Sequence, residues 1–316
     1  MCTALSYKSK NHYFGRNLDV ERSYNESIVI TPRNFGFDFR FANPMNTHHA
    51  IIGMAAVFDN YPLYFDAVNE KGLSIAGLNF PNNAVYGEYV SEKENIAPFE
   101  LIPYILGSCE NIADVKSKLN KINIIHCNFN DNLPATPLHW LIADRERAIT
   151  LENTKDGMRI FDNPFGVLTN NPTFDFHLQN INSYMHLHEG ANENRLSPAL
   201  PFENYSLGMG ALGLPGDFSS ASRFVKAVFV KQKSVCGNSE KESVGQFFHI
   251  LQSVAMPMGC VLMPNGEYEY TRCSCCINTD TQTYYYNTYH DQTFRKEELN
   301  SVDLNGSKLT VFQIEQ

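Results

Sequence analysis

The alternation of apolar and polar residues along this chain predicts mainly antiparallel β-structure. Three pairs of apolar runs are separated by a short polar turn that contains glycine, asparagine or aspartate. TALSY and HYFGRNLD flank KSKN, LYFDAV and LSIAGLNF flank NEKG, and AITLE and RIFDN flank TKDG. Each pair is typical of a β-hairpin, because these turn residues adopt the backbone angles that tight turns require.

Helix-like periodicity is confined to three segments, near residues 98–122, 219–232 and 243–255. In the second segment apolar residues recur three to four positions apart, and Ser219 or Ser220 is suited to be its N-cap. These helices are too few to alternate with parallel strands, so we expect them to cover sheets in a layered α+β domain.

The chain contains no linker-like, repeated or low-complexity tract, so we expect a single domain over residues 1–316. Residues 186–208 form the most polar and irregular stretch. Long segments without periodicity are uncommon in compact domains. We therefore expect a long excursion or an oligomer contact there.

Composition excludes several classes of function. The 316 residues are 43% hydrophobic and carry a formal net charge of −9, without any cluster of Lys and Arg, which opposes nonspecific binding to nucleic acid or an anionic membrane. The start of the chain lacks the apolar region of a signal peptide and no run is long enough to span a membrane, so a cytoplasmic location is expected. In that compartment the eight cysteines are expected to be mostly reduced thiols.

The second residue is a candidate nucleophile. Removal of Met1 would make Cys2 the N-terminus, with a thiol and a free α-amino group on one residue. An α-amino group titrates at about 7.7 to 8.0, close enough to neutrality to accept a thiol proton and return it to a leaving amine. One residue would then supply both nucleophile and base.

Charged residues of the first hairpin fall close to this cysteine. A turn at Ser9 and Lys10 places Cys2 opposite Asn17, within reach of Arg16 and Asp19. A carboxylate can orient the amine, and a cation favours the thiolate. In this register Asp19 shares the face of Cys2 while Arg16 points to the other, so convergence requires a bulge. The alternative is an ordinary edge strand whose Met-Cys start has no function.

Five motifs, distributed in order along the chain, resemble one known family. MCTA, FGRNLD, NEKGLSIAGLNFP, LTNNPTFDF and GLPGDFSSASRF are similar to the choloylglycine hydrolases, the bile salt hydrolase and penicillin V acylase family of N-terminal nucleophile hydrolases. The resemblance implies a four-layer αββα sandwich, the Ntn-hydrolase fold, in which two antiparallel sheets lie between helical layers. It also implies loss of Met1 and no cofactor or metal.

By the same resemblance six residues form the catalytic site: Cys2, Arg16, Asp19, Asn79, Asn170 and Arg223. Cys2 corresponds to the nucleophile. Asn79, through its backbone N–H, and Asn170, through its side-chain amide, correspond to the oxyanion hole that amide attack requires. Without the resemblance, both asparagines would be interpreted as turn residues and Arg223 as a surface charge.

The resemblance also indicates the substrate. Asn79 matches the bile-salt-cleaving branch, whereas the penicillin-cleaving branch has tyrosine there, which favours glycine- or taurine-conjugated bile salts over penicillin V. A rigid apolar substrate needs an apolar lining, and the candidates are Leu18, Phe58, Phe65, Phe129 and Leu133. The implied reaction is hydrolysis through a thioester, with transfer to another amine as a variant. A homotetramer and a gut-bacterial source are also implied. The alternative function is a penicillin V acylase or another N-acyl amide hydrolase of the same family.

Three other interpretations remain open. A Cys-His protease would use a histidine such as His139 as its base. A metal or redox module is suggested by Cys273, Cys275 and Cys276, with His186 and His188, although strand alternation points Cys276 away from the other two cysteines. A bile-acid-binding protein without catalysis would need only the pocket.

Overall fold

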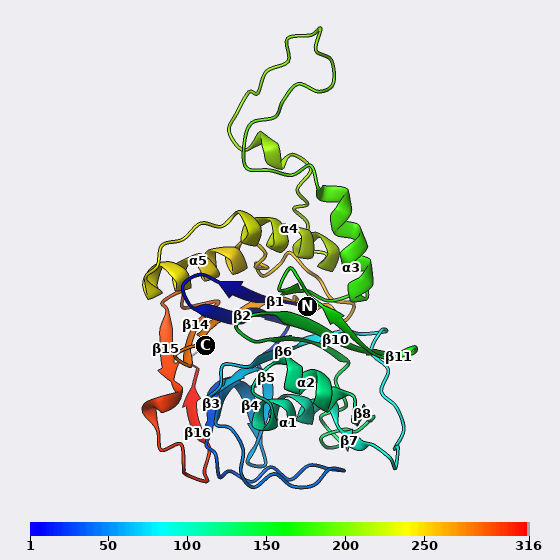
Figure 1. The fold of residues 1–316 in the computed structure, drawn as a ribbon, viewed down its shortest axis with the longest axis vertical. Helices are drawn as coiled ribbons and strands as arrows, with labels where there is room; N and C mark the ends of the chain where they lie inside the picture. The colour runs from blue at the N-terminus through cyan, green and yellow to red at the C-terminus, as the bar shows by residue number, and fades with distance from the viewer. Residues whose placement is uncertain (315–316) are drawn as a thin grey trace.

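Two large antiparallel sheets form the centre of the molecule in a computed structural model that describes residues 1–314 (Figure 1). The first sheet has six strands, in the spatial order β12 (Val167–Leu168), β1 (Cys2–Lys8), β2 (His12–Val20), β13 (Tyr270–Asn278), β14 (Thr283–Thr288) and β15 (Arg295–Glu298). The second sheet has eight, in the order β11 (Gly157–Asp162), β10 (Ala148–Thr154), β9 (Leu138–Ala143), β6 (Ser74–Asn79), β5 (Tyr61–Asn69), β4 (Ile51–Phe58), β3 (Ser27–Thr31) and β16 (Thr310–Gln313). All three predicted hairpins are present.

Helices cover the outer face of each sheet (Figure 1). The first sheet carries α4 (Ser220–Lys233), α5 (Glu240–Gln252) and the short α3 (Phe174–Asn180), and the second carries α1 (Leu101–Ser108) and α2 (Ile112–Leu119). The predicted four-layer αββα arrangement is therefore confirmed. No helix within residues 1–314 is long and apolar enough to cross a membrane.

Several elements depart from the sequence prediction. Ser219 caps α4 as expected, but α5 begins at Glu240 because Ser239 and Glu242 form a capping box that fixes its start. The helix α3 was not predicted. Two short strands, β7 (Glu94–Ile96) and β8 (Ile122–Ile124), pair in parallel and form a small separate sheet.

Strand alternation gives the first sheet two buried faces. The face toward the second sheet carries Cys2, Ala4, Leu18 and Cys275. The opposite face packs against α4 and α5 and is also largely apolar, but the Asn17 side chain on it donates to the Leu251 carbonyl of α5. The start of β1 is therefore buried on both faces.

A long excursion projects from the body beyond α3 (Figure 1). Residues 185–208, called here the arm, contain no helix or strand, and the sequence predicted such an excursion over residues 186–208. Its exposed apolar side chains are Met185, Leu196, Leu200, Phe202, Tyr205 and Leu207. Large apolar groups exposed in this number are typical of an interaction surface.

Candidate active site

The register of the first hairpin differs by one residue from the prediction. Lys8 pairs with His12 across a three-residue turn, so that Cys2 lies opposite Leu18 rather than Asn17. Because a one-residue slip exchanges the two faces of a strand, Arg16 shares the face of Cys2, and Asp19 falls on the other face. The prediction that Asp19 shares the face of Cys2 while Arg16 lies on the other face is therefore wrong.

Arg16 lies between the two sheets, almost completely buried at 2% exposure. Its Nη1 donates to the carbonyl oxygens of Phe65 at 3.0 Å and Gly77 at 2.5 Å. Phe65 is an extra residue in β5, where the pairing with β4 shifts between Met54 and Ala55, and such bulges free backbone groups from the ladder. The β-bulge in the second sheet thus supplies a carbonyl acceptor for the buried Arg16 guanidinium of the first sheet.

The charge of Arg16 is balanced inside the core. Burial alone lowers the pKa of Arg16, but the negative charges of Cys2, Asp66, Cys275 and Asp19 together outweigh burial and raise that pKa above its ordinary value. Asp66 accepts a hydrogen bond from Tyr284 at 2.6 Å, so it is itself held in place. The guanidinium therefore stays charged beside the sulfur.

Asp19 lies near the start of β1. The Thr271 hydroxyl donates to its Oδ1 at 2.6 Å, and its backbone carbonyl is 3.9 Å from the Cys2 sulfur. The β13 strand bulges at the next residue, Arg272, where its pairing with β2 shifts. Burial raises the pKa of the Asp19 carboxyl, while the nearby charge of Arg223 opposes that increase.

Asn170 connects most of the predicted residues. Its Oδ1 accepts from the Cys2 backbone nitrogen at 2.8 Å and from Arg223 Nη2 at 2.7 Å, and its Nδ2 donates to the Asn79 carbonyl at 2.6 Å. Arg223 Nη1 also donates to the Cys2 carbonyl at 2.6 Å and to the Thr3 hydroxyl at 2.7 Å. All six predicted catalytic residues are thus brought together, from strands, a helix and the loop after β12, which are far apart in sequence.

Two residues at this site were not predicted from the sequence. Thr271 holds Asp19, and Glu269, also almost buried, forms an ion pair with the Met1 ammonium. That ammonium also donates to the Asp19 carbonyl at 3.1 Å, and burial lowers its pKa. Spacing in the sequence gives no signal for either residue, because both reach the site only through the pairing of β13 with β2.

The predicted substrate-lining residues fall into separate groups. Leu18 is buried opposite Cys2. Phe58 and Phe129 have ring centroids 6.5 Å apart, and Phe129 pairs with Leu133 through a backbone hydrogen bond of 3.0 Å. Phe65 contacts the Tyr24 ring, with centroids 6.4 Å apart.

The Cys-His alternative conflicts with the position of His139. Both ring nitrogens are already engaged, with Glu152 at 3.2 Å and the Thr169 carbonyl at 2.8 Å, and the side chain is fully buried. Such a ring has no nitrogen left to accept the proton of Cys2. His139 therefore does not act as the base of a Cys-His pair.

The metal-site alternative finds no support. All eight cysteines, which lie within the described residues, are free thiols. Cys273 and Cys275 face the second sheet, and Cys276 faces the helices. Within residues 1–314 no group of three or more His, Cys, Asp or Glu side chains is arranged to hold a metal ion, including His186 and His188 of the arm.

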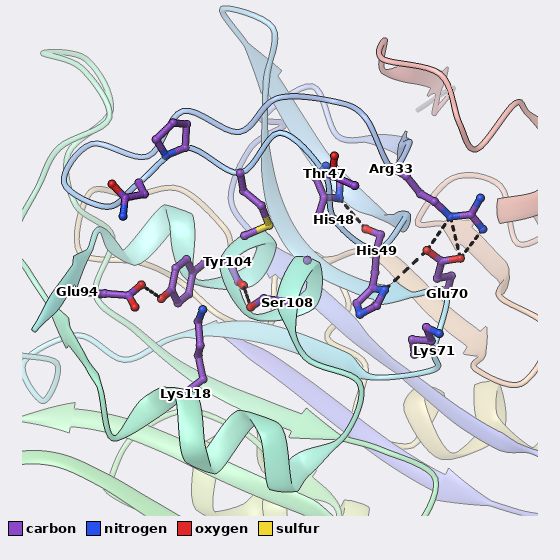
Figure 2. A pocket seen from close by; sticks show the side chains of 14 residues that line it. Arg33, Thr47, His48, His49, Glu70, Lys71, Glu94, Tyr104, Ser108 and Lys118 are labelled. Carbon is purple, nitrogen blue, oxygen red and sulfur yellow. Dashed lines mark hydrogen bonds and ion pairs between the residues drawn. The ribbon is translucent and has the colours of Figure 1, made fainter.

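Two clefts lie outside this constellation. One, of about 760 Å³, is bounded by α1, α2 and the segment before β4, and its charges are mostly paired: Arg33 donates to Glu70, and Lys118 lies over the Tyr104 ring (Figure 2). The other, of about 490 Å³, includes Phe129 in its lining. Neither contains any of the six predicted catalytic residues.

Comparison with known proteins places this geometry in a family. The model of the "linear amide C–N hydrolases, choloylglycine hydrolase family" matches residues 2–312. The chain is 48% identical to the bile salt hydrolase/transferase of Lactiplantibacillus plantarum, over 99% of this chain and 95% of that protein. It is 39% identical to the conjugated bile acid hydrolase of Lactobacillus gasseri, over 99% of this chain and 100% of that one.

Solved structures agree with the sequence comparison. The conjugated bile acid hydrolase of Clostridium perfringens superposes with a TM-score of 0.92 at 35% identity, covering 100% of this chain and 97% of that one. The penicillin V acylase of Agrobacterium tumefaciens shares the fold, with a TM-score of 0.77 at 19% identity, covering 98% and 90% of the two chains. The chain therefore belongs to the choloylglycine hydrolase family of linear amide C–N hydrolases and has the Ntn-hydrolase fold.

Proposed function

We propose that this enzyme is a bile salt hydrolase, which cleaves the amide bond of glycine- or taurine-conjugated bile acids after loss of Met1. The observation that carries the proposal is the constellation of Cys2, Arg16 and Asn170 in a chain that is 48% identical to a protein named bile salt hydrolase/transferase. The reaction releases free bile acid and the amino acid.

The N-terminal residue provides nucleophile and base. When Met1 is removed, the Cys2 nitrogen that now donates to Asn170 Oδ1 becomes a primary amine with the same partner. Burial lowers the pKa of the Met1 amine, and it acts in the same sense on an amine one residue later in the same surroundings. A neutral amine takes the thiol proton, and Arg16 stabilises the resulting thiolate.

The oxyanion forms next to two asparagines. A side-chain amide has two hydrogens, and one hydrogen of Asn170 Nδ2 bonds the Asn79 carbonyl. The second hydrogen, together with the backbone N–H of Asn79, is placed in the role of oxyanion donor. Arg223 and the Cys2 nitrogen fix the same amide from its oxygen side, so the donor needs no reorganisation during the reaction.

The reaction consists of two acyl transfers, first from the substrate amide to Cys2 and then from Cys2 to water. The Cys2 sulfur forms a bond to the substrate carbonyl carbon, the amide C–N bond breaks, and the α-ammonium group returns its proton to the departing glycine or taurine. Water, deprotonated by the same amine, then attacks the thioester and regenerates the thiol. A different amino acid in place of water would give a new conjugate.

Substrate selection is assigned to the apolar residues around the site. We place the steroid body against Leu18, Phe58, Phe65, Phe129 and Leu133, because a rigid apolar ligand requires an extended apolar lining. Phe58 and Phe129 already contact each other, which supports a shared aromatic wall. Asn79 in place of tyrosine favours bile salts over penicillin V, and penicillin V acylase or another N-acyl amide hydrolase is the alternative.

Assembly and location belong to the same proposal. The exposed apolar side chains of the arm support a homotetramer in which each arm is covered by another copy of the chain. We propose a cytoplasmic location, where initiator methionine is removed from new chains.

The test measures amino-acid release from glycine and taurine conjugates, with penicillin V as comparator and Cys2→Ala as control. Release by the wild type that is abolished in Cys2→Ala supports the proposal. Hydrolysis of penicillin V in preference to both conjugates would move the function to the acylase branch. Tight binding of bile salts, unchanged in Cys2→Ala and without turnover, would indicate a binding protein.

A further inference from the structure

A buried pair of ionisable side chains contacts the residues next to Asn79 and Asn170. His139, on β9, and Glu152, on β10, are both fully buried, with His139 Nδ1 at 3.2 Å from Glu152 Oε1. Glu152 Oε1 also accepts from the Phe174 backbone nitrogen at 3.0 Å. Neither side chain touches Cys2, and the reaction described above uses neither.

The hydrogen bonds of this pair require a shared proton. His139 Nε2 bonds the Thr169 carbonyl at 2.8 Å, so this nitrogen carries a hydrogen. The bond between Nδ1 and Glu152 then needs a second hydrogen, either on the ring or on the carboxyl. In both cases the pair is held together in one orientation, and the ring is fixed on both sides.

The ring of His139 contacts the neighbours of both proposed oxyanion donors. Thr169 precedes Asn170, and Phe80 follows Asn79. The Phe80 ring stacks on the imidazole, with centroids 4.1 Å apart and planes at 7°. One rigid side chain therefore sets the spacing between the segment that carries Asn79 and the segment that carries Asn170.

Other contacts hold the Asn170 segment against this ring. His177 Nε2 lies 3.2 Å from the Asn170 carbonyl, and burial lowers the pKa of His177 to about 4, so the neutral ring donates this bond. On the far side, the Ser220 hydroxyl of α4 accepts from the Asn170 backbone nitrogen at 2.8 Å. The segment is thus clamped between α4 and the His139–Glu152 pair.

We propose that His139 and Glu152 are positioning residues that fix the geometry of the oxyanion hole. The inference rests on the proposed function, since it assumes that Asn79 and Asn170 stabilise the oxyanion. A donor displaced by about 1 Å costs about 100-fold in rate, because the bond is made to the transition state. The pair acts through these asparagines and does not touch substrate.

Three variants separate positioning from general packing. His139→Leu removes both ring hydrogen bonds, whereas His139→Gln keeps a donor for the Thr169 carbonyl. Glu152→Gln is isosteric, but a neutral His139 that donates from Nε2 to Thr169 leaves Nδ1 as an acceptor. The Gln amide must then turn its NH2 group toward Nδ1, and the Phe174 N–H loses its acceptor at that position. His48→Leu is the matched control: His48 is also buried and its two ring nitrogens also bond backbone carbonyls, at 2.7 and 2.9 Å, in the cleft of Figure 2.

The readouts are kcat, KM, the melting temperature and the rate of Cys2 alkylation by iodoacetamide. We expect kcat of His139→Leu to fall about 100-fold with KM unchanged, and His139→Gln to recover at least about tenfold of that loss. Alkylation of Cys2 should stay within about threefold of wild type, because the nucleophile is untouched. His48→Leu should lower the melting temperature without this loss of kcat.

A kcat for His139→Leu no lower than that of His48→Leu would overturn the proposal, as would a parallel loss of Cys2 alkylation. If His139→Leu does not fold, Glu152→Gln decides: a kcat reduced more than about tenfold at constant KM supports positioning, and an unchanged kcat overturns it. If the wild type turns over no conjugate, the proposed function fails on its own. Crystal structures of wild type and Glu152→Gln then test whether the pair positions the Asn170 amide. An unmoved Asn170 amide in the variant contradicts the positioning role, and a displaced amide supports it.

Discussion

Asn170 offers the sharpest single-residue test, because its amide connects the nucleophile, a buried cation and the proposed oxyanion donors. Asn170→Ala removes the bonds to the Cys2 nitrogen at 2.8 Å, to Arg223 at 2.7 Å and to the Asn79 carbonyl at 2.6 Å. The bond from the guanidinium is charge-assisted and the other two are ordinary, so their combined contribution to stability is about 4 kcal/mol. A domain with a stability of about 5 to 15 kcal/mol remains folded after that loss.

The expected loss of transition-state stabilisation, about 2.7 to 4 kcal/mol, is similar in size to the loss of folding stability. Loss of one oxyanion donor lowers kcat about 100- to 1,000-fold. The adjacent Asn171 is the control, because its side chain bonds the Pro81 carbonyl at 2.6 Å and Asn83 at 2.7 Å instead of Cys2. Asn171→Ala should lose about 2 kcal/mol of stability and retain kcat within about threefold.

The assay combines amino-acid release from taurine and glycine conjugates with urea unfolding of both variants. We expect a large loss of kcat in Asn170→Ala and a small one in Asn171→Ala. Retention of more than about a tenth of wild-type kcat in Asn170→Ala, in a protein that is still folded, would refute the role of this amide. Equal losses in the two variants would show that the segment, and not the Asn170 amide, matters.

Three further predictions concern charge, pH and assembly. Arg223→Lys should destabilise the protein by about 3 kcal/mol in urea unfolding, since a single ammonium cannot reproduce a buried guanidinium that donates to four groups; unchanged stability would contradict this. Burial lowers the pKa of His12 and of His177 to about 4. The unfolded state therefore binds more protons than the folded state below about pH 6.5. The free energy of unfolding should fall by about 2.5 kcal/mol between pH 7 and 5.5. His12→Gln should remove about half of that pH dependence, and an unaltered slope would contradict the assignment. Replacement of residues 190–208 by a short Gly-Ser linker should reduce the mass of the proposed homotetramer in light scattering, whereas an unchanged mass would exclude the arm as the contact.

Local patterns predicted the hairpins and the main helices, whereas the four-layer arrangement of two stacked sheets was implied only by the family resemblance. The hairpins β1–β2, β5–β6 and β10–β11 follow from alternation and turn residues, and the α4 start at Ser219 follows from capping chemistry. Turn length was not determined by the sequence: KSKN permits a two- or a three-residue turn, and the difference of one residue reversed which face carries Arg16.

Long-range pairing explains what the sequence did not reveal at the site. The bulge that frees the Phe65 carbonyl for Arg16 has no local signal, because it depends on how β5 pairs with β4. Thr271 reaches Asp19 through the pairing of β13 with β2. His139 was considered as a base because histidine often is one, but only the structure shows that both ring nitrogens are engaged.

The central claim, that Cys2 is an N-terminal nucleophile in an amide hydrolase, is tested most directly by intact-mass analysis of the purified protein together with amino-acid release from conjugated bile salts. We expect a mass lower by one methionine residue and release of glycine or taurine, and no release by a form in which Met1 is retained. Turnover by a protein that keeps Met1 would contradict the mechanism.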